Sequence, residues 1–160
     1  MDEQPEKKRL TPQQAKLKAA NYCAYQERSQ KEVKNKLYEY GLWREEVDNV
    51  LTDLILEGFI NEERFAKSYV GGKFRVKKWG RNRILLGLKE HGLSKYCIKK
   101  GLEEIDHHEY ARTLCELIEK KEQLEKETNV FRRREKIARS MIYKGYEADL
   151  VWEFVKELVN

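Results

Sequence analysis

The residues with the clearest chemical potential are the cations between Lys73 and Arg83, which stand among the aromatic residues Phe74 and Trp79. Lysine and arginine can neutralise phosphate groups, and an aromatic ring can stack on a base of single-stranded nucleic acid. The pattern is therefore typical of a surface that binds a large anion. The cations of this run are Lys73, Arg75, Lys77, Lys78, Arg81 and Arg83.

A second basic run lies farther along the chain. Arg132, Lys136 and Arg139 are spaced i, i+4, i+7, so they share one face of a predicted helix, while Ile137 and Met141 face inward. The whole run is Arg132, Arg133, Arg134, Lys136 and Arg139. For both runs the alternative is a solvated charged face, with Phe74 and Trp79 serving as core or junction residues.

Catalytic chemistry is not indicated, because the chain has no nucleophile elbow, P-loop, HExxH motif or glycine-rich dinucleotide turn. His107 and His108 are adjacent, so on a helix they point about 100° apart and cannot share a metal. Glu62 and Glu63 fit the first turn of a helix, where they favour capping over acid–base work. We predict a protein that is not an enzyme and has neither cofactor nor metal.

Composition favours a helical protein. The 160 residues are 38% charged and 40% hydrophobic, with two prolines and nine glycines, so little interrupts helix propensity. The net charge of +5 is moderate and by itself supports nucleic-acid binding only weakly. Three cysteines without CxxC spacing are expected to be small buried hydrophobes. With no leader or membrane-spanning run recognisable, we expect a cytoplasmic protein without disulfides.

Helix start and stop signals divide the chain into nine predicted helices. Thr11, the Ser29–Glu32 capping box, Asn61 and Asp106 are predicted N-caps, because their side chains can accept orphan backbone N–H groups. The helices are expected from Pro12 to about Glu27, from the capping box to Gly41, from about Arg44 to Gly58, and at about 62–77, 81–90, 95–105, 107–126, 128–144 and 147–158.

Several side chains are expected to pack inside these helices. In the first two helices they are Leu17, Ala20, Tyr22, Ala24, Val33, Leu37 and Tyr38. In the helix after Asn61 they are Phe65, Ala66, Tyr69 and Val70. The tryptophans Trp43, Trp79 and Trp152 are also expected in the core or between units.

The helix pattern repeats three times. Gly41, Gly92 and Gly145 are separated by 51 (92−41) and 53 (145−92) positions, and each follows a predicted helix. Five more columns of apolar residues align at fixed offsets from these glycines: Val33, Ile84 and Ile137; Leu37, Leu88 and Met141; Val47, Ile98 and Val151; Leu51, Leu102 and Val155; Leu54, Ile105 and Leu158. A period near 50 residues indicates stacked helical units that complete each other's cores.

We therefore predict an all-α fold of three tandem three-helix repeats, nine helices in all, in an elongated, curved array. A compact bundle is the alternative. The expected organisation is a disordered tail at residues 1–10 and repeats at residues 11–58, 59–105 and 106–160.

At these residues the sequence resembles the RecX family of bacterial recombinase regulators. The resemblance is carried by Gln26–Val33 (QERSQKEV) with Leu37 and Gly41, by Gly58–Ala66 (GFINEERFA), and by Gly80–Ile84 (GRNRI) with Leu88 and Gly92. It is weaker in the third unit, where mainly the turn at Gly145 and the apolar columns support it. The family more often has Asp at the position of Asn61. Asn61 can still act as the N-cap of the helix, but it lacks the negative charge of Asp.

The resemblance implies a protein without catalytic activity that binds the RecA recombinase filament on single-stranded DNA. By this account it limits filament extension, ATP hydrolysis and strand exchange, and so affects DNA repair and the SOS response. The residues expected to bind RecA or DNA are the eleven cations of the two basic runs, and Arg64 is expected to be structural. We expect a monomer with no membrane partner. The alternatives are a stand-alone DNA-binding module and a helical-repeat adaptor for another protein.

Overall fold

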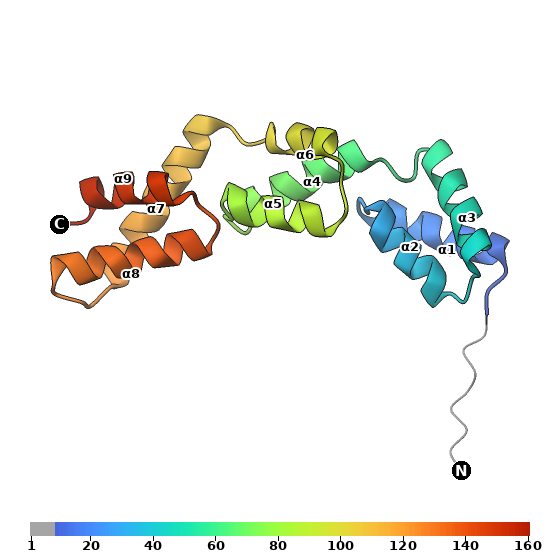
Figure 1. Ribbon diagram of the computed structural model, residues 1–160, viewed down its shortest axis with the longest axis horizontal. Helices are drawn as coiled ribbons and strands as arrows, with labels where there is room; N and C mark the ends of the chain where they lie inside the picture. Colours follow the sequence, from blue (N-terminus) through green and yellow to red (C-terminus); the bar gives the residue numbers. More distant parts are fainter. Residues whose placement is uncertain (1–8) are drawn as a thin grey trace, which may run out of the picture.

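The computed structural model describes residues 9–160, and this part of the chain forms nine α-helices and no strand (Figure 1). The helices are α1 (Pro12–Tyr25), α2 (Gln30–Glu39), α3 (Arg44–Leu56), α4 (Glu62–Arg75), α5 (Arg81–Glu90), α6 (Lys95–Leu102), α7 (His107–Leu124), α8 (Val130–Tyr143) and α9 (Ala148–Leu158). They group into three triplets that follow one another along the long axis of the molecule. The predicted fold class is confirmed, and the compact bundle is not formed.

Capping side chains start most of these helices. Thr11 and Ser29 form reciprocal capping boxes with Gln14 and Glu32. Asn61 accepts the backbone N–H of Arg64 at 2.9 Å, as its predicted role requires. These bonds satisfy N–H groups that have no partner inside the helix, so the boundaries are fixed locally.

The repeated glycines end α2, α5 and α8 in the left-handed region. Gly41, Gly92 and Gly145 have φ values of 90°, 74° and 106°, which other residues rarely adopt. The aligned apolar columns around them are buried or half-buried throughout. The internal repeat is therefore a repeat of the same helix–turn–helix packing.

The three units do not share one core. The first unit, α1–α3, has its own core around Val33, Leu37 and Leu54. The second and third units are fused, because one cluster of buried side chains runs from Phe65 in α4 to Val159 after α9. The described chain thus consists of one small unit and one larger two-unit body.

Backbone contacts between two turns hold the larger body together. The Gly80 N–H donates to the Lys144 carbonyl at 2.9 Å, and the Asn82 N–H donates to the Gly145 carbonyl at 2.9 Å. A Cβ at Gly80 would lie 2.2 Å from the carbonyl carbon of Gly145. Only glycine lets these turns approach so closely.

The junction between the first and second units is polar. The Oγ atom of Ser29 lies 2.9 Å from Nδ1 of His91, and Lys31 donates to the Glu90 carbonyl at 2.7 Å. Arg64 pairs with Glu27 of the first unit. This contact agrees with the expectation that Arg64 has a structural role.

Some packing predictions were wrong. Leu17 is 66% exposed, Tyr38 is 42% exposed and Trp43 is 68% exposed. The buried face of α1 carries Ala15, Ala19 and Cys23 instead. Small side chains let α1 approach its neighbours closely, so the larger residues of this helix turn outward.

Several helix ends also differ from the prediction by a few residues. The helices α4, α6 and α7 end at Arg75, Leu102 and Leu124, two or three residues earlier than expected. Such shifts are typical of helix ends, where the last turn is easily lost. Of the expected N-terminal tail, residues 1–8 lie outside the described residues. Arg9 donates to the Gly41 carbonyl at 2.8 Å, and the Leu10 N–H donates to the Tyr40 carbonyl at 3.0 Å.

Gly80→Ala should destabilise the fused body. The added methyl group would meet backbone rather than a movable side chain, so we expect the free energy of unfolding to fall by about 1–3 kcal/mol. Gly72→Ala is the matched control, since a Cβ there meets nothing within 4 Å and alanine favours the helix. Urea unfolding followed by circular dichroism measures both. Equal stability of the two variants would contradict the close approach.

Candidate nucleic-acid interface

The indole of Trp79 organises part of the first basic run. The Nζ atom of Lys73 lies 4.7 Å from the ring centroid of Trp79, and the Cζ atom of Arg83 lies 4.1 Å from it. The ring is half-buried against the shared core. Trp79 therefore positions two cations by cation–π contact, and the expectation of a packing role is correct for this residue.

Four cations meet at the junction of the second and third units. We call them the cation cluster: Lys78, Arg83, Lys120 and Lys144. Burial lowers the pKa of Lys144, and the positive charges of Arg83, Lys78 and Lys120 lower this pKa further. Within residues 9–160 none of the four forms an ion pair with a carboxylate. The cluster is a concentrated positive field without an internal counter-charge, which favours a bound anion.

The second basic run leads toward this cluster along α8. Arg132, Lys136, Arg139 and Tyr143 are spaced i, i+4, i+7 and i+11, so they form one stripe of the helix. Tyr143 is 79% exposed, and the Cζ atom of Arg83 lies 5.7 Å from its ring centroid. An exposed aromatic ring thus stands where the stripe meets the cation cluster.

Carboxylates neutralise part of the stripe. Arg139 pairs with Glu135 at 2.8 Å, and Lys136 lies 3.7 Å from Glu125 and 3.6 Å from Glu127. The cations of these pairs are exposed, and such surface pairs are weak, so a polyanion can compete for them. The stripe is a weaker cationic surface than the cluster.

Three of the predicted site residues have structural roles instead. Arg81 pairs with Glu147 at 3.0 Å, and its guanidinium lies 3.8 Å from the ring centroid of Tyr110. Arg134 donates to the Val159 carbonyl at 2.7 Å, and Arg133 donates to the Glu127 carbonyl at 3.1 Å. Arg81 thus links the second and third units, whereas Arg133 and Arg134 bind within the third unit, and the structure does not bring any of the three into the cation cluster.

The two remaining cations of the first run are exposed near the end of α4. Arg75 folds back along its own helix, since its Nη1 atom would lie 2.7 Å from a Cβ at Gly71. Lys77 directly precedes Lys78 of the cluster and is exposed. Phe74 is 2% exposed, so the packing alternative is correct for this ring.

Sequence reasoning missed Lys120, Tyr143 and Lys144. Lys144 could have been found, because it directly precedes the repeated Gly145 as His91 precedes Gly92. Lys120 gave no such signal, since only the packing of α7 against the other elements brings it near Lys144. A search for runs of charge overlooks clusters that the fold assembles from single residues.

The other residues that were considered for catalysis or metal binding make structural contacts. Glu63 pairs with Lys67, one turn farther along α4, at 3.3 Å. The Nδ1 atom of His107 lies 2.9 Å from Nη2 of Arg81. Among residues 9–160 no group of three potential ligands could hold a metal ion, and no helix is long and apolar enough to cross a membrane.

Family models match all three units. The models describe the first, second and third three-helix domains of RecX, and they match residues 15–54, 61–102 and 108–155 respectively. This chain belongs to the RecX family. The sequence-based resemblance is therefore confirmed, including for the third unit.

Relatives in the RecX family are distant in sequence. "Regulatory protein RecX" of Clostridium perfringens strain 13 is 29% identical over 135 residues, which cover 83% of this chain and 63% of the relative. "Regulatory protein RecX" of Bacillus mycoides is 27% identical over 146 residues, which cover 91% of this chain and 54% of the relative. The chain thus spans less than two thirds of the length of these two relatives.

Solved RecX structures share the fold. The crystal structure of RecX from Lactobacillus salivarius superposes with a TM-score of 0.81 at 24% identity, covering 92% of this chain and 96% of the other. A second crystal structure of a regulatory protein RecX gives a TM-score of 0.82 at 23% identity, covering 91% of this chain and 73% of the other. At this identity the likeness concerns the arrangement of the helices.

Lys144→Gln should slightly raise the melting temperature at low salt. The substitution removes the cost of burying a charge and the like-charge repulsion from Arg83, Lys78 and Lys120, so Tm should rise by at most a few degrees. The part of the gain that comes from repulsion should vanish near 1 M salt, where the Debye length is about 3 Å. Lys34→Gln, at an exposed position in α2, is the matched control and should change nothing. A lower Tm for Lys144→Gln would refute the repulsive cluster.

Proposed function

We propose that this chain is a non-enzymatic regulator that binds the RecA recombinase filament on single-stranded DNA and mainly inhibits it. By this proposal it limits filament extension, ATP hydrolysis and strand exchange in the cytoplasm, acting as a monomer. Homologous recombination, DNA repair and the SOS response would respond to it. Membership of the RecX family, whose relatives are named regulatory proteins, supports the regulatory part of the proposal.

The observation that carries the nucleic-acid part is the cation cluster. Four positive charges with no carboxylate partner among the described residues suit a phosphate backbone better than a neutral surface. Tyr143 beside the cluster offers an exposed ring on which one base can stack. The α8 stripe extends the positive surface away from the cluster, so several successive phosphates can be contacted.

The shape supports a filament as the partner. An elongated array of three units can follow the surface of a helical polymer over a longer distance than a compact bundle can (Figure 1). Bound there, it would contact protein and nucleic acid together. Repeat proteins commonly use such extended surfaces for binding.

A second candidate is a stand-alone DNA-binding module, and the cation cluster is the observation that favours it. The two candidates differ in whether DNA binding alone accounts for the effect on the recombinase. The deciding experiment is growth of RecA filaments on single-stranded DNA with and without this chain. Inhibition at substoichiometric ratios supports the regulator, because sequestering DNA requires stoichiometric protein. No effect on growth over a wide titration refutes it.

Lys120→Glu combined with Lys144→Glu should weaken binding to single-stranded DNA. If two phosphate contacts are lost, the slope of log K against log salt should become shallower by about 1.4, at about 0.7 per contact. Fluorescence anisotropy with a labelled oligothymidylate measures both affinity and slope. Lys34→Glu with Arg44→Glu changes the net charge equally at exposed positions of the first unit. If this control loses as much affinity, net charge rather than the cluster explains binding.

A further inference from the structure

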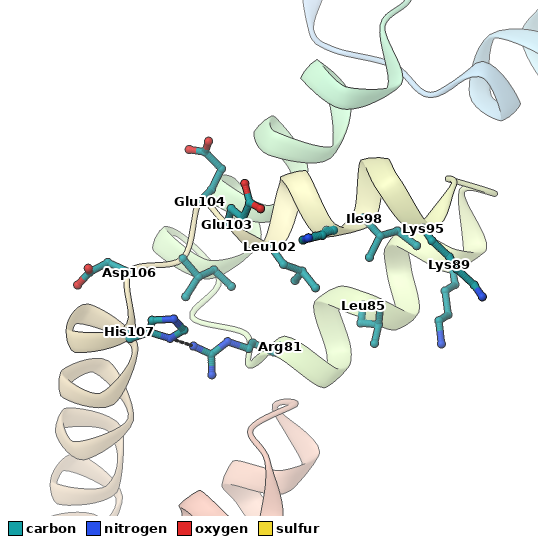
Figure 2. A pocket seen from close by; sticks show the side chains of 12 residues that line it. Arg81, Leu85, Lys89, Lys95, Ile98, Leu102, Glu103, Glu104, Asp106 and His107 are labelled. Atoms are coloured by element: carbon teal, nitrogen blue, oxygen red, sulfur yellow. Dashed lines mark hydrogen bonds between the residues drawn. The ribbon is translucent and has the colours of Figure 1, made fainter.

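A groove of about 850 Å³ lies between α5, α6 and the start of α7 (Figure 2). Its floor is apolar, since Leu85 of α5 faces Ile98 and Leu102 of α6, and all three side chains are half-buried. On α6 the lining residues Lys95, Ile98 and Leu102 are spaced i, i+3 and i+7, so one face of this helix lines the groove.

Charge is divided between the two ends of the groove. Lys89 and Lys95 stand at one end, and Lys99 follows Lys95 by one helical turn. Within residues 9–160 none of these three lysines pairs with a carboxylate. Glu104 and Asp106 stand at the opposite end, where α6 leads into α7, together with Arg81, whose charge is paired with Glu147.

This groove and the cation cluster lie on different faces of α5. Leu85 and Lys89 follow Arg81 at i+4 and i+8, so they share the groove side of the helix. Arg83 follows Arg81 by two residues, which turns it about 200° around the helix axis. A ligand in the groove therefore leaves the cation cluster free.

We propose that the groove binds a helical segment of a partner protein that is amphipathic and acidic at one end. Its apolar stripe would cover Leu85, Ile98 and Leu102, and its acidic residues would meet Lys89, Lys95 and Lys99. This is the usual way in which an amphipathic helix docks into a groove. The inference rests on the proposed function, because the partner that carries the segment is the recombinase filament.

Nucleic acid fits this groove poorly. Glu103, Glu104 and Asp106 line one end and would repel phosphates, and an apolar floor offers a sugar–phosphate backbone nothing to bind. The separation of positive and negative ends suits a peptide, whose side chains can alternate in charge along its length. Electrostatic complementarity of this kind also sets the direction of a bound helix.

Lys95→Glu combined with Lys99→Glu tests the inference in the full chain. Both positions are exposed, so the fold should survive, which circular dichroism verifies. We expect affinity for preformed RecA filaments on single-stranded DNA to fall at least tenfold, while affinity for the free oligonucleotide stays within twofold of the unmodified chain. Lys34→Glu with Arg44→Glu is the control of equal charge and should preserve both affinities.

The outcomes separate this inference from the proposed function. Unchanged filament binding by the groove variant overturns the groove alone and leaves the regulator intact. An equal loss of filament and oligonucleotide affinity also overturns it, because the lysines would then contact DNA. If the unmodified chain does not bind the filament, the proposed function fails and the inference fails with it.

A cross-linking measurement checks the chemistry of the bound segment. Replacing Lys99 with the photoreactive residue p-benzoylphenylalanine places a cross-linker in the groove. Illumination in the presence of the filament should join it to a recombinase peptide that has an apolar helical stripe and acidic residues, identified by mass spectrometry. Cross-linking to DNA, to a second copy of this chain, or to a basic peptide would overturn the proposal.

Discussion

The close contact of two turns, at Gly80 and Gly145, is the constraint on which the rest of the structure depends. Two backbone hydrogen bonds cross this contact, and a Cβ at Gly80 would meet the backbone of Gly145. Because the backbones meet directly, the cores of the second and third units merge into one. Tyr146 strengthens the joint, since its hydroxyl donates to the Lys78 carbonyl at 2.9 Å from a fully buried ring. Fusion at this point fixes the relative positions of α5, α7 and α8.

That fusion has an electrostatic consequence. It brings Lys78 and Arg83 of the second unit beside Lys120 and Lys144 of the third, so burial, and after it the positive charges of these three neighbours, lower the pKa of Lys144. A folded-state pKa below the unfolded value means that ionised Lys144 disfavours folding, so this cost is relieved as pH rises past the folded pKa. The buried aromatic contact between Phe74 and Tyr110, whose ring centroids lie 5.8 Å apart, crosses the same junction and stabilises it. Structures often tolerate local instability of this kind at a binding site.

The sequence predicted the fold well because its signals are local. Capping residues, helix-ending glycines and a period near 50 residues each act within one or two turns of helix, so Asn61 and Gly92 could be read without tertiary information. The packing face of α1 was misjudged, because small residues such as Ala15 gave a weaker signal than Leu17.

Prediction of the binding-site residues was less complete than prediction of the fold, for a similar reason. Runs of arginine were visible, yet only the fold shows that Arg134 binds the Val159 carbonyl while Lys120 joins the cluster.

The two junctions between units differ in chemistry. The second and third units meet at a shared apolar core, whereas the first and second units meet through polar contacts. The glycine joint excludes water and fuses two cores, so the cation cluster and the apolar groove are fixed relative to each other. The other joint depends on polar contacts such as Ser29 with His91, and burial there raises the pKa of Glu62 and makes its ionised form unfavourable. Water can replace polar contacts at little cost in free energy, whereas it cannot replace a shared apolar core. The polar junction is therefore the weaker of the two, while the fused body holds the cation cluster and the apolar groove in fixed relative positions.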